Sequence, residues 1–316
     1  MSKYRTLKAY ILSKADMDYV GICPADALSG EPEGHLPTDL LPTAKSIIVF
    51  GRRMTDGAVS AAFRHFEDRV TAAQSAYADH CVYLSANFLL LNDSYNLCEH
   101  LERIYGGCSM PLTFNAMQAV EPENHSVPYF ADPYKAGLPL DIAKAAAAAG
   151  LGELGWSRRL LTPKDGPRVN LTAVITDIEF DQYDLPYNGP RLCDPAACHI
   201  CSTMCPTRAI PAYEDSEPQT VNIGGHSHII CDMNANGCAV AAMAMRKEFS
   251  GRVPVKDVVE SYHPTDEEMA QGFSKKSIEA GMCLDHWPQF FCDKCLIYCP
   301  AGNWKERFHD TGLSKL

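Results

Sequence analysis

The sequence predicts a mixed α/β (α+β) fold in two domains, residues 1–185 and residues 186–316. Two observations support this class. In the first part, short apolar runs rich in β-branched residues alternate with longer stretches of helical periodicity. Cysteine runs that end in Cys-Pro occur only in the second part. The Asp-, Tyr- and Pro-rich stretch 181–192 marks the expected junction between the domains.

The first domain is expected to alternate helices and strands. Helical periodicity predicts a helix within residues 4–20 and long helices within 69–104, and residues 108–139 are expected to form a loop region. The apolar runs predict strands at Val20–Cys23, Ser46–Gly51 and Asn170–Asp177.

A helix and a glycine-rich turn precede the last of these strands. The alanine-rich stretch 140–149 predicts a helix that ends at Gly150 in the left-handed conformation. The turn Gly150–Trp156 has two interpretations: a tight connection that requires positive φ, or backbone pressed against a large flat ligand. It is not a Walker motif, and its place after a helix excludes the dinucleotide-binding fingerprint.

In the second domain, short strands are expected at Ala209–Ile210 and Val221–Ile223. A largely helical insertion is expected at about 230–282. Within it, the spacing from Thr265 to Glu268 is typical of a capping box, which predicts a helix start.

Composition and charge limit the function classes. The chain is 46% hydrophobic and 21% charged, which is typical of a globular protein. Its formal net charge of −11 disfavours a partner bound through phosphates, so nucleic acid is not expected. No apolar run reaches about 18 residues and the first residues lack a secretory apolar region, so no membrane span and a cytoplasmic location are expected. Fourteen cysteines then indicate a reducing compartment, where thiols bind metal or stay free.

The strongest signal is a pair of cysteine runs. The first run, Cys193 to Pro206, reads C-x4-C-x2-C-x3-C-P, and the second run, Phe291 to Pro300, contains C-x2-C-x3-C-P. This is the pattern of bacterial two-cluster ferredoxins, in which the last cysteine of each run binds the cluster of the other run. Two such runs favour two 4Fe–4S clusters over zinc.

Eight thiolates are needed for two such clusters, and the two runs supply seven. The eighth is Cys231, Cys238 or Cys283, and Cys283 is favoured because it lies nine residues before Cys292 and its loop can close on the same cluster. One cluster would then be bound by Cys193, Cys198, Cys201 and Cys299, and the other by Cys205, Cys283, Cys292 and Cys295.

Two motifs carry a resemblance to a known superfamily. The stretch AGLGELGWSRRLLTPKDGPRVNLTAVITD, Ala149 to Asp177, followed by CPTRAI, Cys205 to Ile210, resembles the cobalamin-dependent iron–sulfur reductases, which comprise epoxyqueuosine reductase and the respiratory reductive dehalogenases. The resemblance implies a nitroreductase-like domain that holds base-off cobalamin, followed by a ferredoxin-like domain with two clusters. It implies a corrinoid site lined by Gly150, Leu151, Gly152, Leu161, Thr162, Pro163 and Gly166.

The chain also departs from that superfamily. Four residues separate Cys193 from Cys198, where the family usually has two. The Asp-Tyr-His motif of epoxyqueuosine reductases is absent upstream of the glycine-rich turn, and so is the export signal of the dehalogenases. We therefore expect a cytosolic paralogue that acts on a different substrate.

The resemblance implies an oxidoreductase. A low-potential donor such as ferredoxin or flavodoxin would supply electrons, and the corrinoid would reduce a small-molecule substrate. Candidate proton donors are Tyr105, Tyr129 and Tyr134, and Arg158 is a candidate to stabilise developing negative charge. Two alternatives are an iron–sulfur electron carrier without corrinoid and a reductive activator of a partner corrinoid protein.

Overall fold

A computed structural model describes residues 2–68, 70–77, 80–81, 88–112, 131–134, 138–242, 261–269 and 292–307. The helices are α1 (Lys3–Lys14), α2 (Pro37–Leu40), α3 (Asp56–Asp68), α4 (Thr71–Tyr77), α5 (Leu90–Tyr105), α6 (Ile142–Ala148), α7 (Ile200–Met204), α8 (Ala235–Ala242), α10 (Lys294–Ile297) and α11 (Trp304–Arg307), with short 3-10 helices at Ala25–Leu28 and Tyr213–Asp215. The strands are β1 (Tyr19–Pro24), β2 (Ser46–Arg53), β3 (Ser109–Leu112), β4 (Glu153–Leu154), β5 (Leu160–Leu161), β6 (Val169–Thr176), β7 (Gln219–Ile223) and β8 (His226–Ile230).

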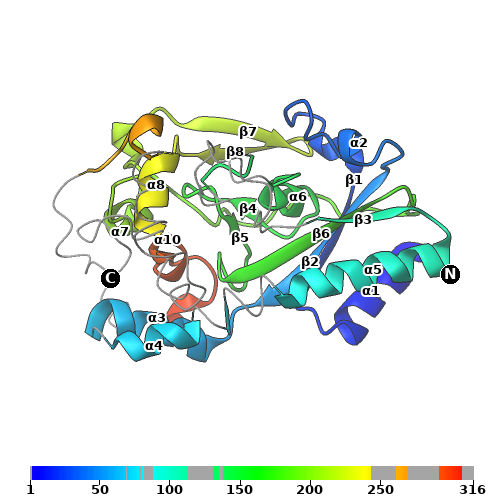
Figure 1. The fold of residues 1–316 in the computed structure, drawn as a ribbon, viewed down its shortest axis with the longest axis horizontal. Coiled ribbons are helices and arrows are strands. Elements are labelled where there is room, and N and C mark those ends of the chain that lie inside the picture. The colour runs from blue at the N-terminus through cyan, green and yellow to red at the C-terminus, as the bar shows by residue number, and fades with distance from the viewer. Residues whose placement is uncertain are drawn as a thin grey trace.

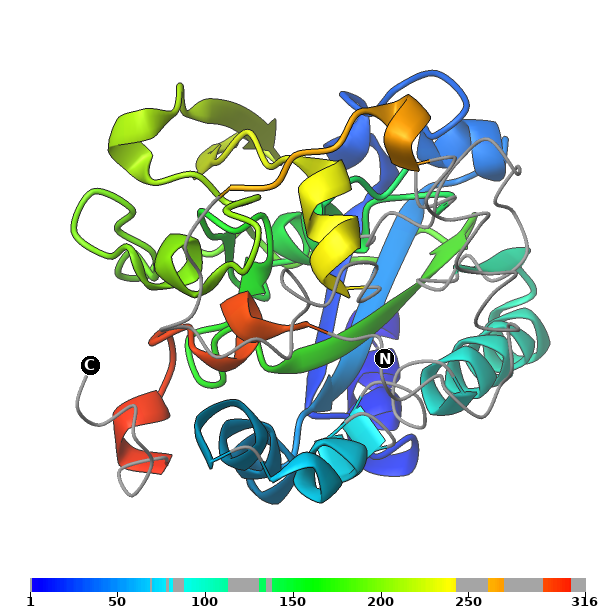
Figure 2. The same ribbon diagram turned by 60° about the vertical axis from the view of Figure 1, so that its left-hand side comes forward.

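The fold is mixed α/β, built on a four-stranded antiparallel sheet in the order β1-β2-β6-β3 (Figure 1). The two central strands pair along their whole length, from Ser46 opposite Thr176 to Arg53 opposite Val169. Helices α1 and α5 lie on one side of the sheet and α6 on the other (Figures 1 and 2). Both faces of β2 and β6 are therefore buried, which explains why these strands are continuous apolar runs in the sequence.

Helix α6 approaches the sheet closely because its side chains are small. The alanines from Ala145 to Ala149 are buried against the core. Opposite them, Gly21 of β1 leaves no room for a side chain, since a Cβ there would overlap the carbonyl oxygen of Ala149. The helix ends as predicted, with Gly150 at a φ of 76°. This packing places the glycine-rich turn after α6 at one end of the sheet.

The cysteine-rich part of the chain gathers beside α3 and α4. Helix α10 carries part of the second cysteine run and packs against α7 of the first run and against α3 (Figure 2). The predicted junction 181–192 is tied to the first domain, because Asp184 accepts hydrogen bonds from Lys8 Nζ and the Ile22 backbone N–H, each at 2.8 Å.

The predicted strands at residues 20–23, 46–51 and 221–223 are confirmed as parts of β1, β2 and β7, and the strand predicted at 170–177 is confirmed as β6 except for Asp177, which follows its end. The strand predicted at Ala209–Ile210 is wrong, and the loop predicted for 108–139 is wrong at Ser109–Leu112, which forms the edge strand β3. Pro111 obscures β3 in the sequence, although an edge strand tolerates proline.

The capping box is confirmed, since Thr265 Oγ1 accepts from the Glu268 backbone N–H at 3.2 Å and Glu268 Oε2 accepts from the Thr265 N–H at 2.8 Å. Most of the predicted insertion at 230–282 lies outside the described residues, and α8 is a helical part of it. No helix within the described ranges is long and apolar enough to cross a membrane.

We predict that Gly21→Val destabilises the protein, because the new side chain would push α6 away from the sheet. Overpacking of this kind typically costs about 1–3 kcal/mol. The check is the thermal midpoint measured by circular dichroism. Gly57→Ala in α3 is the control, since a Cβ at that position meets nothing within 4 Å. An unchanged midpoint for Gly21→Val would contradict the prediction.

Candidate active site: two cysteine groups and an adjoining pocket

The turn between β5 and β6 docks the second cysteine run onto the first domain. Thr162 and Gly166 pair through both backbone groups at 2.9 Å, and the Thr162 hydroxyl accepts from the Asp165 N–H at 3.2 Å. Gly166 has a φ of 58°, and a Cβ on it would overlap the carbonyl oxygen of Ala301. The turn therefore requires glycine both for its own conformation and for contact with the segment that follows Cys299.

Arg168, at the end of this turn, holds the second run directly. Its fully buried guanidinium donates to the carbonyl oxygens of Cys299 at 2.7 Å and Ala301 at 2.6 Å, and more weakly to that of Leu296 at 3.4 Å. Burial lowers the pKa of Arg168 to about 10, so the group remains charged at neutral pH. These charge-assisted bonds fix the backbone that presents Cys299.

Asp165 ties the same turn to two other segments. Its carboxylate accepts hydrogen bonds from the Tyr19 hydroxyl of β1 and from Arg307 of α11. Arg307 also pairs with Asp56 at the start of α3. Burial raises the pKa of Tyr19, so the phenol keeps its proton and donates.

The described cysteines from Cys193 onward, apart from Cys231, fall into two groups. In the first cysteine group, burial and the neighbouring thiols of Cys193 and Cys198 raise the pKa of Cys299 to about 12. Cys201 interacts in the same way with Cys295, Cys299, Cys193 and Cys231, so it borders both groups, and we place it in the first because it follows Cys198 in the same run. The first group is therefore Cys193, Cys198, Cys201 and Cys299.

The second cysteine group is defined in the same way. Burial raises the pKa of Cys238 well above its ordinary value, and the neighbouring thiols of Cys205, Cys295 and Cys292 raise it further. The second group is therefore Cys205, Cys238, Cys292 and Cys295. Cys231 lies beside this group and packs in the same apolar cluster around Trp156. Each run thus contributes its last cysteine to the group of the other run.

Several N–H groups point at the sulfur atoms. The Trp156 backbone N–H donates to Cys193 Sγ at 3.3 Å, and the Ala209 N–H donates to Cys205 Sγ at 3.2 Å. Arg159 Nε donates to Cys295 Sγ at 3.3 Å. Such bonds favour the thiolate form that binds metal. Within the described ranges no three His, Cys, Asp or Glu side chains are arranged to hold a single metal ion.

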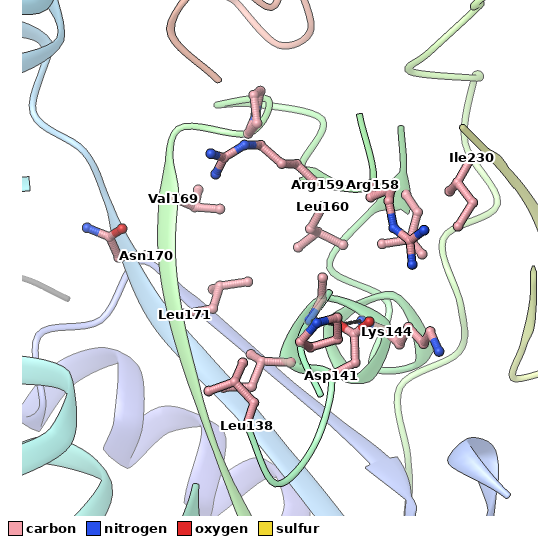
Figure 3. Close-up of a pocket in the computed structure, with 15 residues that line it drawn as sticks. Leu138, Asp141, Lys144, Arg158, Arg159, Leu160, Val169, Asn170, Leu171 and Ile230 are labelled. Atoms are coloured by element: carbon pink, nitrogen blue, oxygen red, sulfur yellow. Dashed lines mark hydrogen bonds between the residues drawn. The ribbon is translucent and has the colours of Figure 1, made fainter. Parts of the chain in front are cut away.

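A pocket opens between α6, the glycine-rich turn and the first residues of β6 (Figure 3). Its empty volume, including the part open to solvent, is about 830 Å³. Apolar walls come from Leu138, Ile142, Leu154, Leu160, Leu171 and Ile230. The charged residues that line it are Asp141, Lys144, Arg158 and Arg159.

Two consecutive arginines separate the pocket from the cysteines. Arg158 has a φ of 64°, which is rare for a residue other than glycine, and the two guanidinium groups point apart (Figure 3). The side chain of Arg158 makes no hydrogen bond or ion pair to any of the described residues. By contrast, Lys144 bonds Glu31 at 2.7 Å and Arg159 bonds Asp293 at 2.6 Å. Among the described residues, Arg158 is thus the pocket cation left to meet a ligand.

A proton-holding cluster lies beside the pocket rim. Tyr134, which follows the pocket residue Pro133, donates its hydroxyl hydrogen to Glu31, and Lys144 donates to both oxygens of the same carboxylate. Burial raises the pKa of Glu31, and Lys144 opposes that rise. The Tyr134 ring packs on His35 with centroids 4.1 Å apart.

The structure brings together some of the predicted catalytic residues and not others. Arg158 lines the pocket, whereas Tyr134 does not line it and is connected through Glu31 to the pocket residue Lys144. Tyr105 ends α5 beside β3, which pairs with the far end of β6. Tyr129 and Cys283 lie outside the described residues.

The residues that the resemblance assigned to a corrinoid site occupy the glycine-rich turn and the β5–β6 turn. Leu161 and Thr162 are buried, and Pro163 is exposed. Leu151 packs at the edge of the core. Gly150 and Gly152 face the backbone of Leu185 and Leu161 respectively. Those assignments remain predictions.

Sequence reasoning missed Arg159, Asp165 and Arg168. Arg168 holds the second run and Asp165 bonds Arg307 beyond it, and nothing in the local spacing of the DGPR stretch indicates partners more than about 130 residues later. Charged residues in an apolar strand-and-turn context were the only available signal, because such residues are rarely buried unless paired.

Comparisons with known proteins give structural neighbours only. No protein-family model and no curated protein matches the sequence. Epoxyqueuosine reductase from Streptococcus thermophilus aligns with a TM-score of 0.44 at 14% identity, covering 98% of this chain and 82% of that one. An epoxyqueuosine reductase with a modified tRNA stem loop aligns with a TM-score of 0.41 at 16% identity, covering 93% of this chain and 80% of that one. A reductive dehalogenase described in terms of B12-dependent dehalogenation aligns with a TM-score of 0.46 at 18% identity, covering 95% of this chain and 37% of that one. These neighbours are of the two kinds that the sequence resemblance names.

We predict that Arg168→Leu releases the second cysteine run, because buried carbonyl oxygens lose their donor. An unsatisfied buried acceptor costs about 1–3 kcal/mol, so a loss of about 3 kcal/mol or more is expected. The thermal midpoint and the rate of Cys299 alkylation in metal-free protein both measure this. The control is Arg103→Gln, which removes only an exposed pair with Glu99. Equal midpoints for the two variants would refute the prediction.

Proposed function

We propose that this chain is a reductase that holds two 4Fe–4S clusters beside a pocket for a corrinoid and its substrate. The observation that carries the proposal is the exchange of terminal cysteines: Cys299 of the second run lies with the first group, and Cys205 of the first run lies with the second group. That exchange is the arrangement of two-cluster ferredoxins. Residues 186–316 would then form the ferredoxin-like domain, and residues 1–185 the nitroreductase-like, corrinoid-binding domain.

The donor sets fit such clusters. Four thiolates surround a cubane, each on a different iron atom, so four separated corners are needed rather than convergence on one point. Each group provides four cysteines, and N–H groups from Trp156, Arg159 and Ala209 reach their sulfur atoms. When bound, the clusters would supply one-electron transfer. We expect a low-potential ferredoxin or flavodoxin as the donor.

Cys238 is the eighth ligand in this proposal. Its thiol faces Cys205, Cys292 and Cys295, whereas the sequence favoured Cys283, which the structure does not describe. Cys231 is the weaker alternative, since its surroundings include Arg158 as well as the second-group thiols Cys295 and Cys205.

The pocket would hold the corrinoid and the substrate against the second cysteine group. A bound corrinoid would supply the reductive chemistry. The apolar walls exclude water. The Arg158 guanidinium binds an anionic group and so orients the molecule that carries this group. Tyr134 holds a proton on its phenol oxygen and donates it to the Glu31 carboxylate, which also pairs with Lys144.

One observation favours a second candidate function, electron transfer without a corrinoid. The glycines assigned to the corrinoid site are each explained by contact with protein backbone: Gly150 with Leu185, Gly152 with Leu161 and Gly166 with Ala301. A protein that kept the cluster domain and used the turn only for packing would show the same contacts. Corrinoid binding separates the two functions.

We predict that the iron content of anaerobically reconstituted variants identifies the eighth ligand. The wild-type chain should hold about eight iron atoms, and Cys238→Ala should lose roughly half, because one cluster lacks a corner. Cys231→Ala and Cys283→Ala are the matched controls and should retain the full content. Full iron in Cys238→Ala together with a loss in Cys283→Ala would restore Cys283 as the ligand.

We predict that protein reconstituted with iron, sulfide and hydroxocobalamin retains corrinoid absorption bands after desalting. Ala143→Phe narrows the pocket from α6 and should abolish those bands while the broad iron–sulfur absorption remains. Ala72→Phe, on the exposed face of α4, is the control and should retain both. If the wild-type chain shows iron–sulfur absorption but no corrinoid bands, corrinoid binding is contradicted and the result favours electron transfer without a corrinoid.

A further inference from the structure

Arg159 lies in the wall between the pocket and the second cysteine group. Its side chain is 6% exposed, and it lines the pocket as well as contacting the cysteine. Nε donates to Cys295 Sγ at 3.3 Å, and Nη2 donates to Asp293 Oδ1 at 2.6 Å. The guanidinium therefore reaches a proposed cluster ligand on one side and a carboxylate on the other.

A chain of buried contacts holds this guanidinium in place. Asp293 adopts a φ of 45°, and its second carboxylate oxygen accepts from the Tyr77 hydroxyl at 3.0 Å. Tyr77 is fully buried, and burial raises its pKa well above the ordinary value, so the phenol stays a donor. Because both ends of Asp293 are fixed, the Arg159 Nε–H stays directed at the sulfur.

Backbone N–H groups donate to both cysteine groups, at Cys193 and at Cys205, and the second group also receives a charged side-chain donor. In the first group, the donor to Cys193 is the backbone N–H of Trp156, which no side-chain substitution removes. In the second group, the donor to Cys295 is a charged side chain. Hydrogen bonds to sulfur and nearby positive charge both raise the reduction potential of an iron–sulfur cluster, because they stabilise the electron that reduction adds.

We infer that Arg159 is a positioning residue that sets the reduction potential of the cluster bound at Cys295 above the value it would otherwise have. The inference rests on the proposed function, since it requires the clusters. An external reductant such as dithionite donates one electron to the oxidised cluster, and no bond is formed or broken. Arg159 lowers the free energy of the reduced form through its charge and its N–H···S bond.

The size of the effect follows from the type of bond. A hydrogen bond to a charged group is strong enough to change the equilibrium constant for reduction at least about tenfold. For one electron, a tenfold change is about 59 mV. Removal of Arg159 should therefore lower one potential and leave the other near its original value.

The test is a dithionite titration of reconstituted protein, monitored by electron paramagnetic resonance, with iron content measured first. Arg159→Leu should keep its iron, and one of its two clusters should become at least about tenfold harder to reduce. Arg159→Lys keeps the positive charge but lacks the Nε–H that contacts the sulfur, so the potential of that cluster should shift less than in Arg159→Leu. The matched control is Arg158→Leu, the neighbouring arginine that donates to no described sulfur, and it should shift least.

Two unchanged clusters in an iron-replete Arg159→Leu protein would overturn the inference. If Arg159→Leu fails to assemble, Arg159→Gln tests the same point with a polar side chain, because it removes the positive charge and should lower the potential of the same cluster; an unchanged or raised potential would overturn the inference. Wild-type protein without any reducible cluster signal would instead overturn the proposed function.

Discussion

The buried guanidinium of Arg168 is the interaction on which the arrangement of the site depends. It joins the start of β6, in the central sheet, to the backbone around Cys299, near the end of the described chain. Other contacts also place the second cysteine run, namely those of α10 with α7 and α3 and the bonds of Asp293 with Arg159 and Tyr77, but they all act before Cys299 in the sequence. Both cysteine groups draw members from both runs, so the position of one short segment decides the geometry of both groups.

The segment from the glycine-rich turn through Arg168 serves several sites at once. Its first residues pack α6 against the sheet, Trp156 and Arg159 reach the two cysteine groups, and Arg158 enters the pocket. The left-handed conformation of Arg158 allows these separate contacts, because it directs the side chains of Arg158 and Arg159 to opposite sides. The two interpretations of this turn, tight packing and ligand binding, therefore do not exclude each other. Its glycines allow close packing, while neighbouring residues of the segment face the cysteines and the pocket.

The sequence predicted the features that depend on local pattern. The strands β2 and β6 could be predicted because each is a continuous run rich in β-branched residues. The capping box at Thr265 could be predicted because its two residues are only three positions apart. The cysteine runs were readable because ligand spacing is itself local. One prediction that failed depends on a partner distant in sequence, because β3 needs the edge of β6. Spacing could not choose among Cys231, Cys238 and Cys283 either, because Cys238 meets the second cysteine group only through the tertiary arrangement. The same holds for Arg168, whose acceptors follow about 130 residues later.

The separation between Arg168 and its acceptors also has a kinetic consequence. The sheet strands β1, β2 and β6 and helix α6 are complete by residue 176, whereas the second run must close a loop of more than a hundred residues to dock. Loop closure of that length is entropically costly and slow compared with local pairing. We therefore expect the sheet to form before the cysteine groups are complete. During synthesis, the thiols of the first run emerge before Cys292, Cys295 and Cys299, so neither group can be complete until the second run has been made.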